Sequence, residues 1–170
     1  RRKYIELINS YIGDIYLNIA GLGELRVNYI SDYQNKTKEE LQDNYKKSLS
    51  KDLAFGKTNF GVHHDDLGFY LDNKDLKDYG SQGQQKNAVI SWKFSEIEIF
   101  KSQKKIFPIL ILDDLLSELD EIKINNIFKF IDEDIQTFIT TTEIDKVTSL
   151  LKDDNYKRIH ISNGKLEEVQ

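Results

Sequence analysis

The chain of 170 residues contains no cysteine, no methionine and a single proline. Without cysteine, disulfide bonds and thiolate metal sites are excluded, which is compatible with a reducing compartment. No apolar run approaches the ~20 residues of a membrane span, and no signal peptide is visible, so we expect no membrane partner. The loop G-x-x-x-x-G-K-[ST], which cradles nucleotide phosphates, is also missing.

The charge balance limits the possible functions further. The net charge of -5 argues against a dedicated nucleic-acid module, whose surface should be basic, although a local basic patch stays open. Hydrophobic residues make up 39% and charged residues 31%, which favours a globular domain. Because the sequence begins with Arg1-Arg2-Lys3 and lacks methionine, we expect it to be a segment of a longer protein. The missing phosphate loop favours the same interpretation.

The first fifty residues carry two local patterns. Alternating polar and apolar residues predict a β-hairpin made of 16–19 and 24–29, with glycines in its turn. Thr37 and Glu40 form a capping box, which predicts the start of a charged helix over 37–51. Its buried stripe is expected at every fourth residue: Leu41, Tyr45 and Leu49.

The middle of the chain predicts a short hairpin and a long helix. The hairpin begins with 67–71 and turns at Asp72-Asn73, and the helix covers 84–103. Two rows of large apolar residues indicate that this helix is buried on two sides. The rows are Ile90, Phe94 and Ile97, and Val89, Trp92 and Phe100.

The last third has the strand–helix–strand–helix order of a parallel sheet. The strands are expected at 109–112 and 136–142, and the helices after Ser117 as N-cap and over 143–151. The inward residues of the first helix are expected to be Leu119, Ile122, Ile127, Phe130 and Ile131. A final hairpin is predicted around Asn163-Gly164, a strong turn signal.

The segment 108–120, PILILDDLLSELD, is the most informative of the chain. Its apolar run suits a strand buried on both faces of a parallel sheet. Asp113 and Asp114 follow at the carboxyl end, where open α/β sheets bind ligands. In a nucleotide hydrolase, Asp113 could hold Mg²⁺ while Asp114 orients or deprotonates the attacking water. The alternative is that two acids merely cap a strand-to-helix turn.

The segment S-Q-G-Q-Q at Ser81 to Gln85 precedes the long helix. Gly83 would let the backbone approach a ligand closely. The N-terminus of the helix offers free N–H groups and a positive dipole end to an anion, and the Ser81 hydroxyl adds a donor. The alternative is a simple helix N-cap with polar neighbours.

Two further groups contain chemically active residues. A hydroxyl of Thr140-Thr141-Thr142, at the end of a strand, could face the same ligand, although Thr140 and Thr141 more simply fill the strand. The run His63-His64-Asp65-Asp66 contains metal-ligand residue types. Neighbouring side chains of an extended chain point in opposite directions, so we favour a polar loop near a nucleotide over a metal site.

Together these motifs resemble the ABC-type ATPases. Ser81 to Gln85 is similar to their signature motif, and LILDDLLSELD is similar to their Walker B strand and D-loop, D-E-x-x-S-x-L-D. Thr142 falls where many members have the switch histidine. The S-Q-G-Q-Q form, the acid pair and the threonine run together resemble the RecF family. Gly61 to Leu67 is similar to its G-P-H-R-D-D-L, but His64 replaces the arginine, so that residue's role does not carry over.

The resemblance implies an α/β fold: the C-terminal half of a P-loop ABC-type ATPase head, with a parallel sheet, antiparallel hairpins and part of a helical second lobe. Residues 1–54 would end the second lobe, and 55–170 would form the ATPase lobe. ATP would lie between two head-to-tail subunits. The implied roles are ATP binding in trans by Ser81, Gln82, Gly83 and Gln84, Mg²⁺ binding by Asp113, catalysis by Asp113, Asp114 and Thr142, and D-loop contacts by Ser117 and Asp120.

The implied function is that of a bacterial DNA repair and recombination mediator. Such a protein forms an ATP-dependent homodimer on duplex DNA near single-strand gaps, and with RecO and RecR it assists RecA loading in the cytoplasm, at the nucleoid. This chain alone is expected to lack ATPase activity, because the phosphate loop would lie upstream. Three alternatives remain: the head of another SMC-like ATPase, a phospho-receiver domain, and a binding module whose acids are structural.

Overall fold

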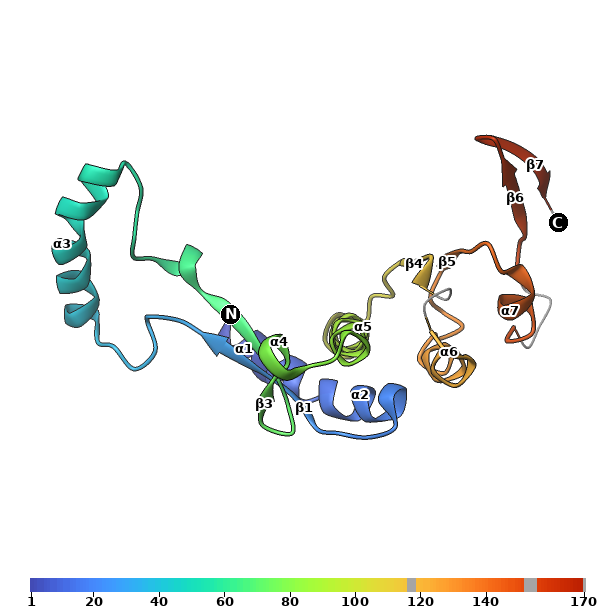
Figure 1. Cartoon of the computed structure of the whole chain (residues 1–170), viewed down its shortest axis with the longest axis horizontal. Helices are drawn as coiled ribbons and strands as arrows, with labels where there is room; N and C mark the ends of the chain where they lie inside the picture. The colour runs from blue at the N-terminus through green and yellow to red at the C-terminus, as the bar shows by residue number, and fades with distance from the viewer. Residues whose placement is uncertain (116–118, 152–155, 170) are drawn as a thin grey trace. The chain divides into compact units, whose positions relative to one another are not determined.

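The computed structural model describes residues 1–115, 119–151 and 156–169. The chain divides into two compact units, Arg1–Pro108 and Ile109–Gln170, which we call the first and second unit. Figure 1 labels the elements along the chain. No helix within the described ranges is long and apolar enough to cross a membrane.

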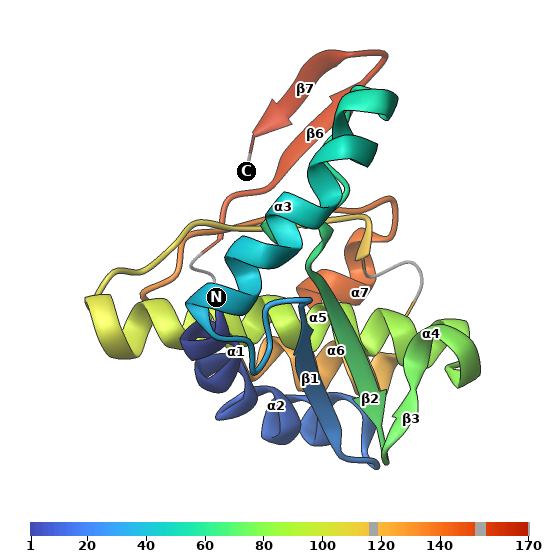
Figure 2. The ribbon, with the colours of Figure 1, turned by 90° about the vertical axis from the view of Figure 1, so that its left-hand side faces the viewer.

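The first unit contains a three-stranded antiparallel sheet in the order β1-β2-β3. β1 (Leu25–Ile30) pairs along its whole length with β2 (Asp66–Leu71), and β2 continues into the short β3 (Lys74–Asp75). Figure 2 shows the β1–β2 ribbon. The predicted turn at Asp72-Asn73 is confirmed, since both residues have the positive φ angles, 50° and 64°, of a tight hairpin turn.

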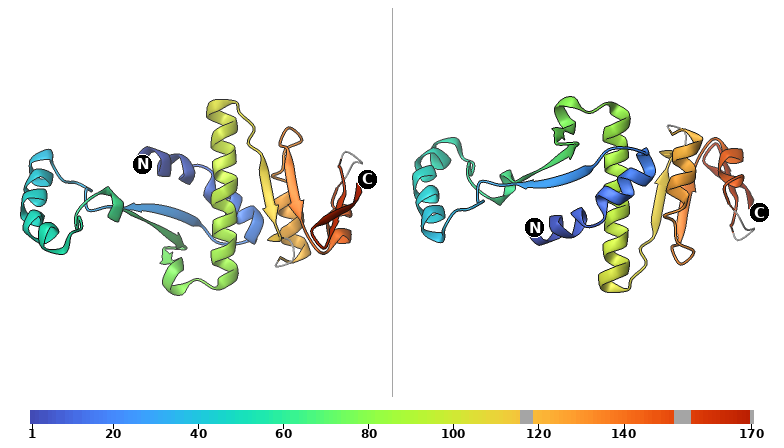
Figure 3. Two further views of the ribbon diagram at one scale, coloured as in Figure 1. Left: turned by 90° about the horizontal axis from the view of Figure 1, so that it is seen from above. Right: turned by 90° about the horizontal axis from the view of Figure 1, so that it is seen from below.

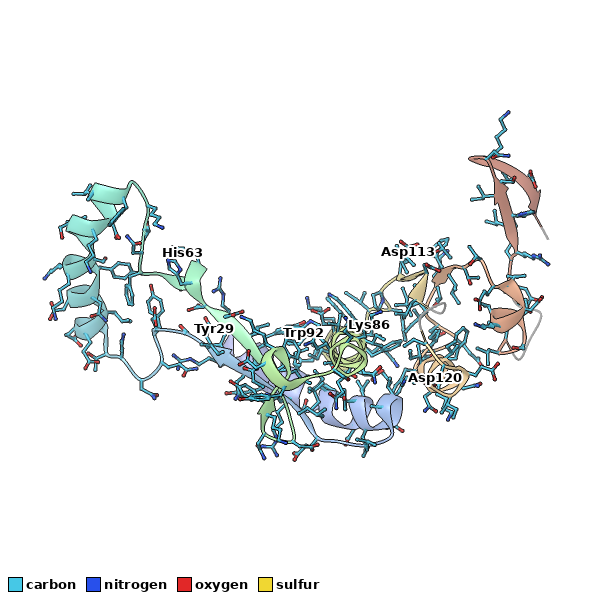
Figure 4. All side chains as sticks on the ribbon, viewed as in Figure 1. Tyr29, His63, Lys86, Trp92, Asp113 and Asp120 are labelled. Atoms are coloured by element: carbon cyan, nitrogen blue, oxygen red, sulfur yellow. The ribbon has the colours of Figure 1, made fainter. Side chains whose placement is uncertain are left out.

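Five α-helices and a short 3-10 helix (Val62–His64) complete the first unit. The α-helices are α1 (Arg2–Asn9), α2 (Ile12–Ala20), α3 (Lys38–Phe55), α4 (Leu76–Tyr79) and α5 (Gln82–Ile99), which continues as a π-helical turn at Phe100–Lys104. α1 and α2 pack against both β1 and α5 (Figure 3). Trp92 of α5, labelled in Figure 4, meets the ring edges of Tyr4 and Phe69, with centroids 6.4 and 5.6 Å away. This aromatic contact joins α1, β2 and α5.

The predicted strand at 16–19 is wrong, because these residues belong to α2. Tyr16 and Ile19 are buried on the same helix face as Ile12 and Ile15. That spacing has the helical period, which four alternating residues alone cannot distinguish from a strand. The real partner of β1 is β2, some forty residues further along the chain.

Helix α3 confirms its predicted start but not its predicted burial. The Thr37 hydroxyl accepts the Glu40 N–H at 3.2 Å, while the Glu40 carboxylate accepts the Thr37 N–H at 2.7 Å. No described residue of α3 is buried, and Leu49 is 55% exposed. The physical reason is topological: α3 connects β1 to β2 and lies beyond the end of their ribbon (Figure 1). Tyr45 is the residue of α3 with aromatic neighbours among the described residues, Phe60 at 5.0 Å and Tyr33 at 6.5 Å between ring centroids.

Of the two rows of apolar residues predicted to be buried on helix α5, the first is buried and the second is largely not. Ile90, Phe94 and Ile97 are buried, whereas Val89 and Phe100 are exposed. The other buried positions of α5 are Asn87, Ile99 and three small residues, Ala88, Ser91 and Ser95. The two serine hydroxyls bond to backbone carbonyls of the same helix, each at 2.7 Å, so their burial is satisfied. A search for large apolar residues misses such a face.

The second unit contains the predicted βαβ arrangement. β4 (Leu110–Asp113) and β5 (Thr137–Thr140) pair in parallel, with α6 (Glu121–Phe128) between them and α7 (Ile144–Thr148) after them. The final hairpin of β6 (Ile159–Ser162) and β7 (Lys165–Val169) turns at Asn163-Gly164, as predicted. Ile124 and Val147 form a small core, against which Ile139 of β5 packs.

Three expectations for the second unit need correction. β4 is not buried on both faces, since Ile109 and Ile111 are exposed and, among the described residues, its sheet has two strands. Ser117 lies outside the described residues, and the helix that follows begins at Glu121 with Asp120 as its N-cap. Ile122 is 74% exposed, because the inward face of this short helix carries Ile124 and Ile127 instead.

Candidate functional site

The signature-like segment forms the first turn of α5. Ser81 is the N-cap: its hydroxyl accepts the Gln84 N–H at 3.2 Å, and the Gln84 side-chain oxygen accepts the Ser81 N–H at 2.8 Å. Gly80 precedes it in a tight bend, where an added Cβ would lie 2.5 Å from the Leu76 carbonyl oxygen. The chain therefore presents the N-terminus of α5 in a fixed geometry, with Ser81, Gln82 and Gly83 exposed.

Gly83 has no packing reason to be glycine in the described structure. An added Cβ would meet no described atom within 4 Å, and no positive φ is found there. Glycine inside a helix costs roughly 0.5–1 kcal/mol relative to alanine. A residue that weakens the helix without helping the fold is typical of a surface that another molecule approaches closely.

The carboxylates of the second unit lie at the carboxyl end of β4. The register places Asp113 opposite Thr140 of β5, and the Thr140 hydroxyl donates to Asp113 Oδ1 at 2.5 Å. Asp113 and Asp114 are both exposed, and Figure 4 labels Asp113 at the end of its strand. The sequence prediction of two acids at a strand end is thus correct.

Asp114 leaves the strand with an unusual backbone. Its φ of 47° lies in the left-handed region, which costs a residue other than glycine roughly 1–2 kcal/mol. Its N–H donates to both the carbonyl oxygen and the hydroxyl of Thr140, at 3.2 and 3.0 Å. Such conformations gather at functional sites, where the surrounding structure enforces them. The turn thus ends the strand at its two consecutive acids.

Thr140, rather than Thr142, is the threonine that contacts the two acids in the described hydrogen bonds. Thr142 lies in an exposed bend beyond β5 and contacts neither acid in the described bonds, whereas Thr140 contacts both Asp113 and Asp114. Thr141 accepts the Glu143 N–H at 2.9 Å in a local turn. From the sequence alone, Thr140 is expected to fill the strand. The register of the two strands, which sequence does not give, is the missing signal.

Asp120, the predicted D-loop acid, caps helix α6. Its Oδ1 accepts the Lys123 N–H at 2.9 Å and its Oδ2 pairs with the Lys123 ammonium at 2.6 Å. The hydrogen bonds from the Lys123 side chain and backbone hold the pKa of Asp120 below its usual value. Its side chain remains about half exposed, at 54%, so one edge stays accessible to a second molecule.

The two histidines and the following acids do not converge on a metal. Both imidazole Nε2 atoms lie near the Thr58 carbonyl oxygen, at 3.0 Å for His63 and 3.2 Å for His64. Asp65 points the other way, where its carboxylate accepts bonds from Tyr29 and from Arg1. No group of three or more possible metal ligands occurs in the parts of the chain that the structure describes.

The donor set at the end of β4 fits magnesium. Two carboxylates and one hydroxyl supply only oxygen atoms, which hard divalent cations prefer. Mg²⁺ usually takes one or two carboxylates from a protein and completes its shell with water and phosphate oxygens. Asp113 could therefore hold the ion without a further cluster of protein ligands, and Asp114 could face a water beside it.

Curated relatives share one name. No protein-family model matches the chain. Proteins named "DNA replication and repair protein RecF" from Bacillus cereus (strain G9842) and Bacillus thuringiensis (strain Al Hakam) are each 35% identical to it over 176 residues. These matches cover 98% of the chain and 46% of each relative. The chain thus spans about half the length of the curated relatives it matches, which is consistent with the predicted C-terminal half.

Solved structures agree on the fold. The recombination mediator protein RecF in the RecFOR pathway, solved as RecF-ATPrS and as RecF-ATP, matches with TM-scores of 0.77 and 0.76 at 27% and 28% identity. Each match covers 98% of the chain, and 45% and 44% of the respective neighbour. A structure from work on ATP-driven dimerization of SMC ATPases, at 13% identity and a TM-score of 0.57, covers 99% of the chain and 84% of its own, and shares the fold alone. The predicted α/β fold class is confirmed, and the chain belongs to the RecF family.

Proposed function

We propose that this chain is the signature-bearing and Walker-B-bearing portion of a RecF-type ATPase that mediates DNA repair and recombination. The acid pair at the end of β4, held beside the next parallel strand, is the observation that carries the proposal. A nucleotide hydrolase needs a ligand for its metal ion, which Asp113 would supply, and a base for the attacking water, which Asp114 would supply. The structures solved as RecF-ATP and RecF-ATPrS support ATP as the nucleotide.

In this proposal the second unit serves the nucleotide of its own subunit. Asp113 binds Mg²⁺, directly or through water, and Asp114 orients the attacking water or accepts its proton. When bound, the ion neutralises the charge that develops on the γ-phosphate. Thr142, in the exposed bend after β5, stands at the position of the family's switch residue. Asp120, whose pKa the Lys123 side chain and backbone lower, would contact the second subunit as a D-loop residue together with Ser117.

The first unit serves the nucleotide of the partner subunit. Ser81, Gln82, Gly83 and Gln84 would contact its γ-phosphate through hydroxyl and backbone N–H donors at the N-terminus of α5. ATP then joins two head-to-tail subunits, and hydrolysis separates them. The assignment of 1–54 to a second lobe and of 55–170 to the ATPase lobe belongs to the same proposal.

The biological role follows from the family. The relatives are DNA replication and repair proteins, and the solved neighbours act in the RecFOR pathway. We propose that the whole protein binds duplex DNA at single-strand gaps in the bacterial cytoplasm and assists RecA loading with RecO and RecR. The net charge of -5 implies that DNA meets a local surface rather than the whole protein.

The test is the Asp113→Asn variant of the full-length protein. We expect DNA-stimulated ATP hydrolysis to fall by at least about a hundredfold, because the metal loses its charged ligand. Asp134→Asn, at an exposed position in a turn of the same unit, is the matched control and should hydrolyse ATP normally. An Asp113→Asn protein with unchanged DNA-stimulated ATPase would show that the acid pair is structural.

A further inference from the structure

Thr140 lies at the centre of the hydrogen bonds that join β4 to β5 at their carboxyl ends. A hydroxyl has one hydrogen to donate and two lone pairs to accept with. In this structure the hydrogen goes to Asp113 Oδ1, at 2.5 Å, and one lone pair accepts the Asp114 N–H, at 3.0 Å. One side chain therefore contacts both consecutive acids, the first by its carboxylate and the second by its backbone.

The contact is set by strand register and by the stiffness of threonine. Asp113 and Thr140 are partners in the parallel ladder, so their side chains lie on the same face of the sheet. Threonine is branched at Cβ, which restricts χ1 and keeps the hydroxyl in place. The hydroxyls of the neighbouring threonines make local bonds instead. Thr141 accepts the Glu143 N–H, and Thr137 donates to the Ile135 carbonyl oxygen at 3.1 Å.

The bond leaves the Asp113 carboxylate with one oxygen occupied and one available. Oδ1 accepts the Thr140 hydroxyl, while Oδ2 accepts no hydrogen bond from any described residue. A carboxylate held in this way points a single oxygen at a cation in a fixed direction. The bond to the Asp114 N–H stabilises the left-handed turn, with φ of 47°, on which the direction of the second carboxylate depends.

We propose that Thr140 is the positioning residue of the metal site: its hydroxyl fixes the Asp113 carboxylate for Mg²⁺ and the Asp114 turn for the attacking water. The inference rests on the proposed function, because it assigns a role within the same site. Groups that orient a metal ligand typically contribute 10–100-fold to metal affinity or activity. Thr140 acts through the two acids and need not touch the ion.

The experiment compares Thr140→Val, Thr140→Ser and Thr141→Val in the full-length protein. Valine keeps the shape and removes the hydroxyl, and serine restores the hydroxyl. Thr141→Val removes a hydroxyl from the adjacent position, where it accepts the Glu143 N–H at 2.9 Å in a local turn. The first readout is the dissociation constant of Mn²⁺, by electron paramagnetic resonance, with a non-hydrolysable ATP analogue bound. The second is the Mg²⁺ concentration that half-saturates ATP hydrolysis.

We expect Thr140→Val to raise the Mn²⁺ dissociation constant about tenfold and to raise the half-saturating Mg²⁺ concentration similarly. Thr140→Ser should recover most of the affinity, and Thr141→Val should match the wild type. If Thr140→Val does not fold, Thr140→Ser against Thr140→Ala gives the same comparison. If Thr140→Val or Thr140→Ala keeps the wild-type Mn²⁺ affinity while Asp113→Asn loses it, the inference about Thr140 is overturned and the proposed function is not. Wild-type affinity in Asp113→Asn overturns the proposed function itself.

Discussion

Ser81 and Gln84 cap each other across the first turn of α5, each side chain accepting the backbone N–H of the other. In this arrangement the Ser81 hydroxyl acts as an acceptor, so its own hydrogen remains to be donated. The capping role and the proposed phosphate contact are therefore compatible in one residue. A substitution that keeps the helix cap but prevents the phosphate contact would separate these two roles.

Ser81→Asp should separate the two roles. Aspartate caps helices as well as serine does, so we expect the stability of the chain to change by only a few tenths of a kcal/mol, whereas Ser81→Ala should cost about 1 kcal/mol. In the full-length protein the new carboxylate would face the γ-phosphate, and juxtaposed like charges cost several kcal/mol. ATP-dependent dimerisation should therefore be lost. Urea denaturation and sedimentation with ATP measure the two effects.

Thr37→Asp is the matched control for this substitution. Thr37 forms the same kind of capping box with Glu40 at the start of α3, away from the signature segment. The control should retain both stability and ATP-dependent dimerisation. A Ser81→Asp protein that still dimerises with ATP would contradict the proposed phosphate contact.

Gly83→Ala should make the chain more stable and the protein less active. The new methyl group meets no described atom within 4 Å, and alanine is a better helix former by roughly 0.5–1 kcal/mol. In the full-length protein the methyl group would stand where the partner's nucleotide approaches, so we expect weaker ATP-dependent dimerisation. Gly13→Ala on α2, where the Cβ lies 3.6 Å from the Leu25 carbonyl oxygen, should leave dimerisation unchanged. Equal dimerisation of both variants would count against a close approach at Gly83.

The sequence predicted the elements whose signals are local. The capping box at Thr37, the turn at Asn163-Gly164 and the two acids at the end of β4 all depend on neighbouring residues, and all are found. Pairing over long distances was not predictable in the same way. The alternation over 16–19 was assigned to a strand because nothing local identifies β2 as the partner of β1.

The candidate site likewise combines features that local sequence predicts with features that depend on long-range strand pairing. The place of Asp113 and Asp114 at the end of a strand was predictable, because the two acids directly follow an apolar run in the sequence. The role of Thr140 depends on which residue of β5 lies opposite Asp113, and a shift of one residue would point its hydroxyl to the other face. Burial of α3 was overestimated because a stripe of spaced apolar residues does not reveal whether another element lies beside it.

Ile124→Ala and Ile122→Ala should differ strongly in their effect on the stability of this chain. Ile124 is 1% exposed and packs with Val147, so its truncation should cost about 2–5 kcal/mol. Ile122, two residues earlier on the same helix, is exposed, and its truncation should cost less than about 0.5 kcal/mol. Denaturant unfolding followed by circular dichroism gives both values. Similar losses would mean that α6 has the opposite face inward.

The acid stability of the first unit should depend on Asp65. Its carboxylate is held by the hydroxyls of Ser31 and Tyr29 and by the Arg1 guanidinium, which keep its pKa below the usual value. A lowered pKa contributes stability above the unfolded pKa of about 3.9, and that contribution is lost as the pH falls through the folded pKa. Asp65→Asn should therefore melt earlier than the wild type at pH 7, with a smaller drop in Tm between pH 5 and 3. Asp66→Asn, at the exposed neighbour, is the control, and parallel Tm curves for Asp65→Asn and the wild type would contradict the assignment.

The chain by itself should neither hydrolyse ATP nor bind it tightly. The second unit offers one acid for the metal and one for the water, and the first unit offers one helix N-terminus for a partner's phosphate. The sequence contains no glycine-rich loop to hold the triphosphate. Carboxylates without such a loop repel the nucleotide, and Mg²⁺ alone brings only a few contacts. Calorimetric titration of these 170 residues with Mg²⁺-ATP should show no binding at micromolar concentrations. Micromolar affinity in that titration would mean that the chain contains a complete nucleotide site that its motifs do not reveal.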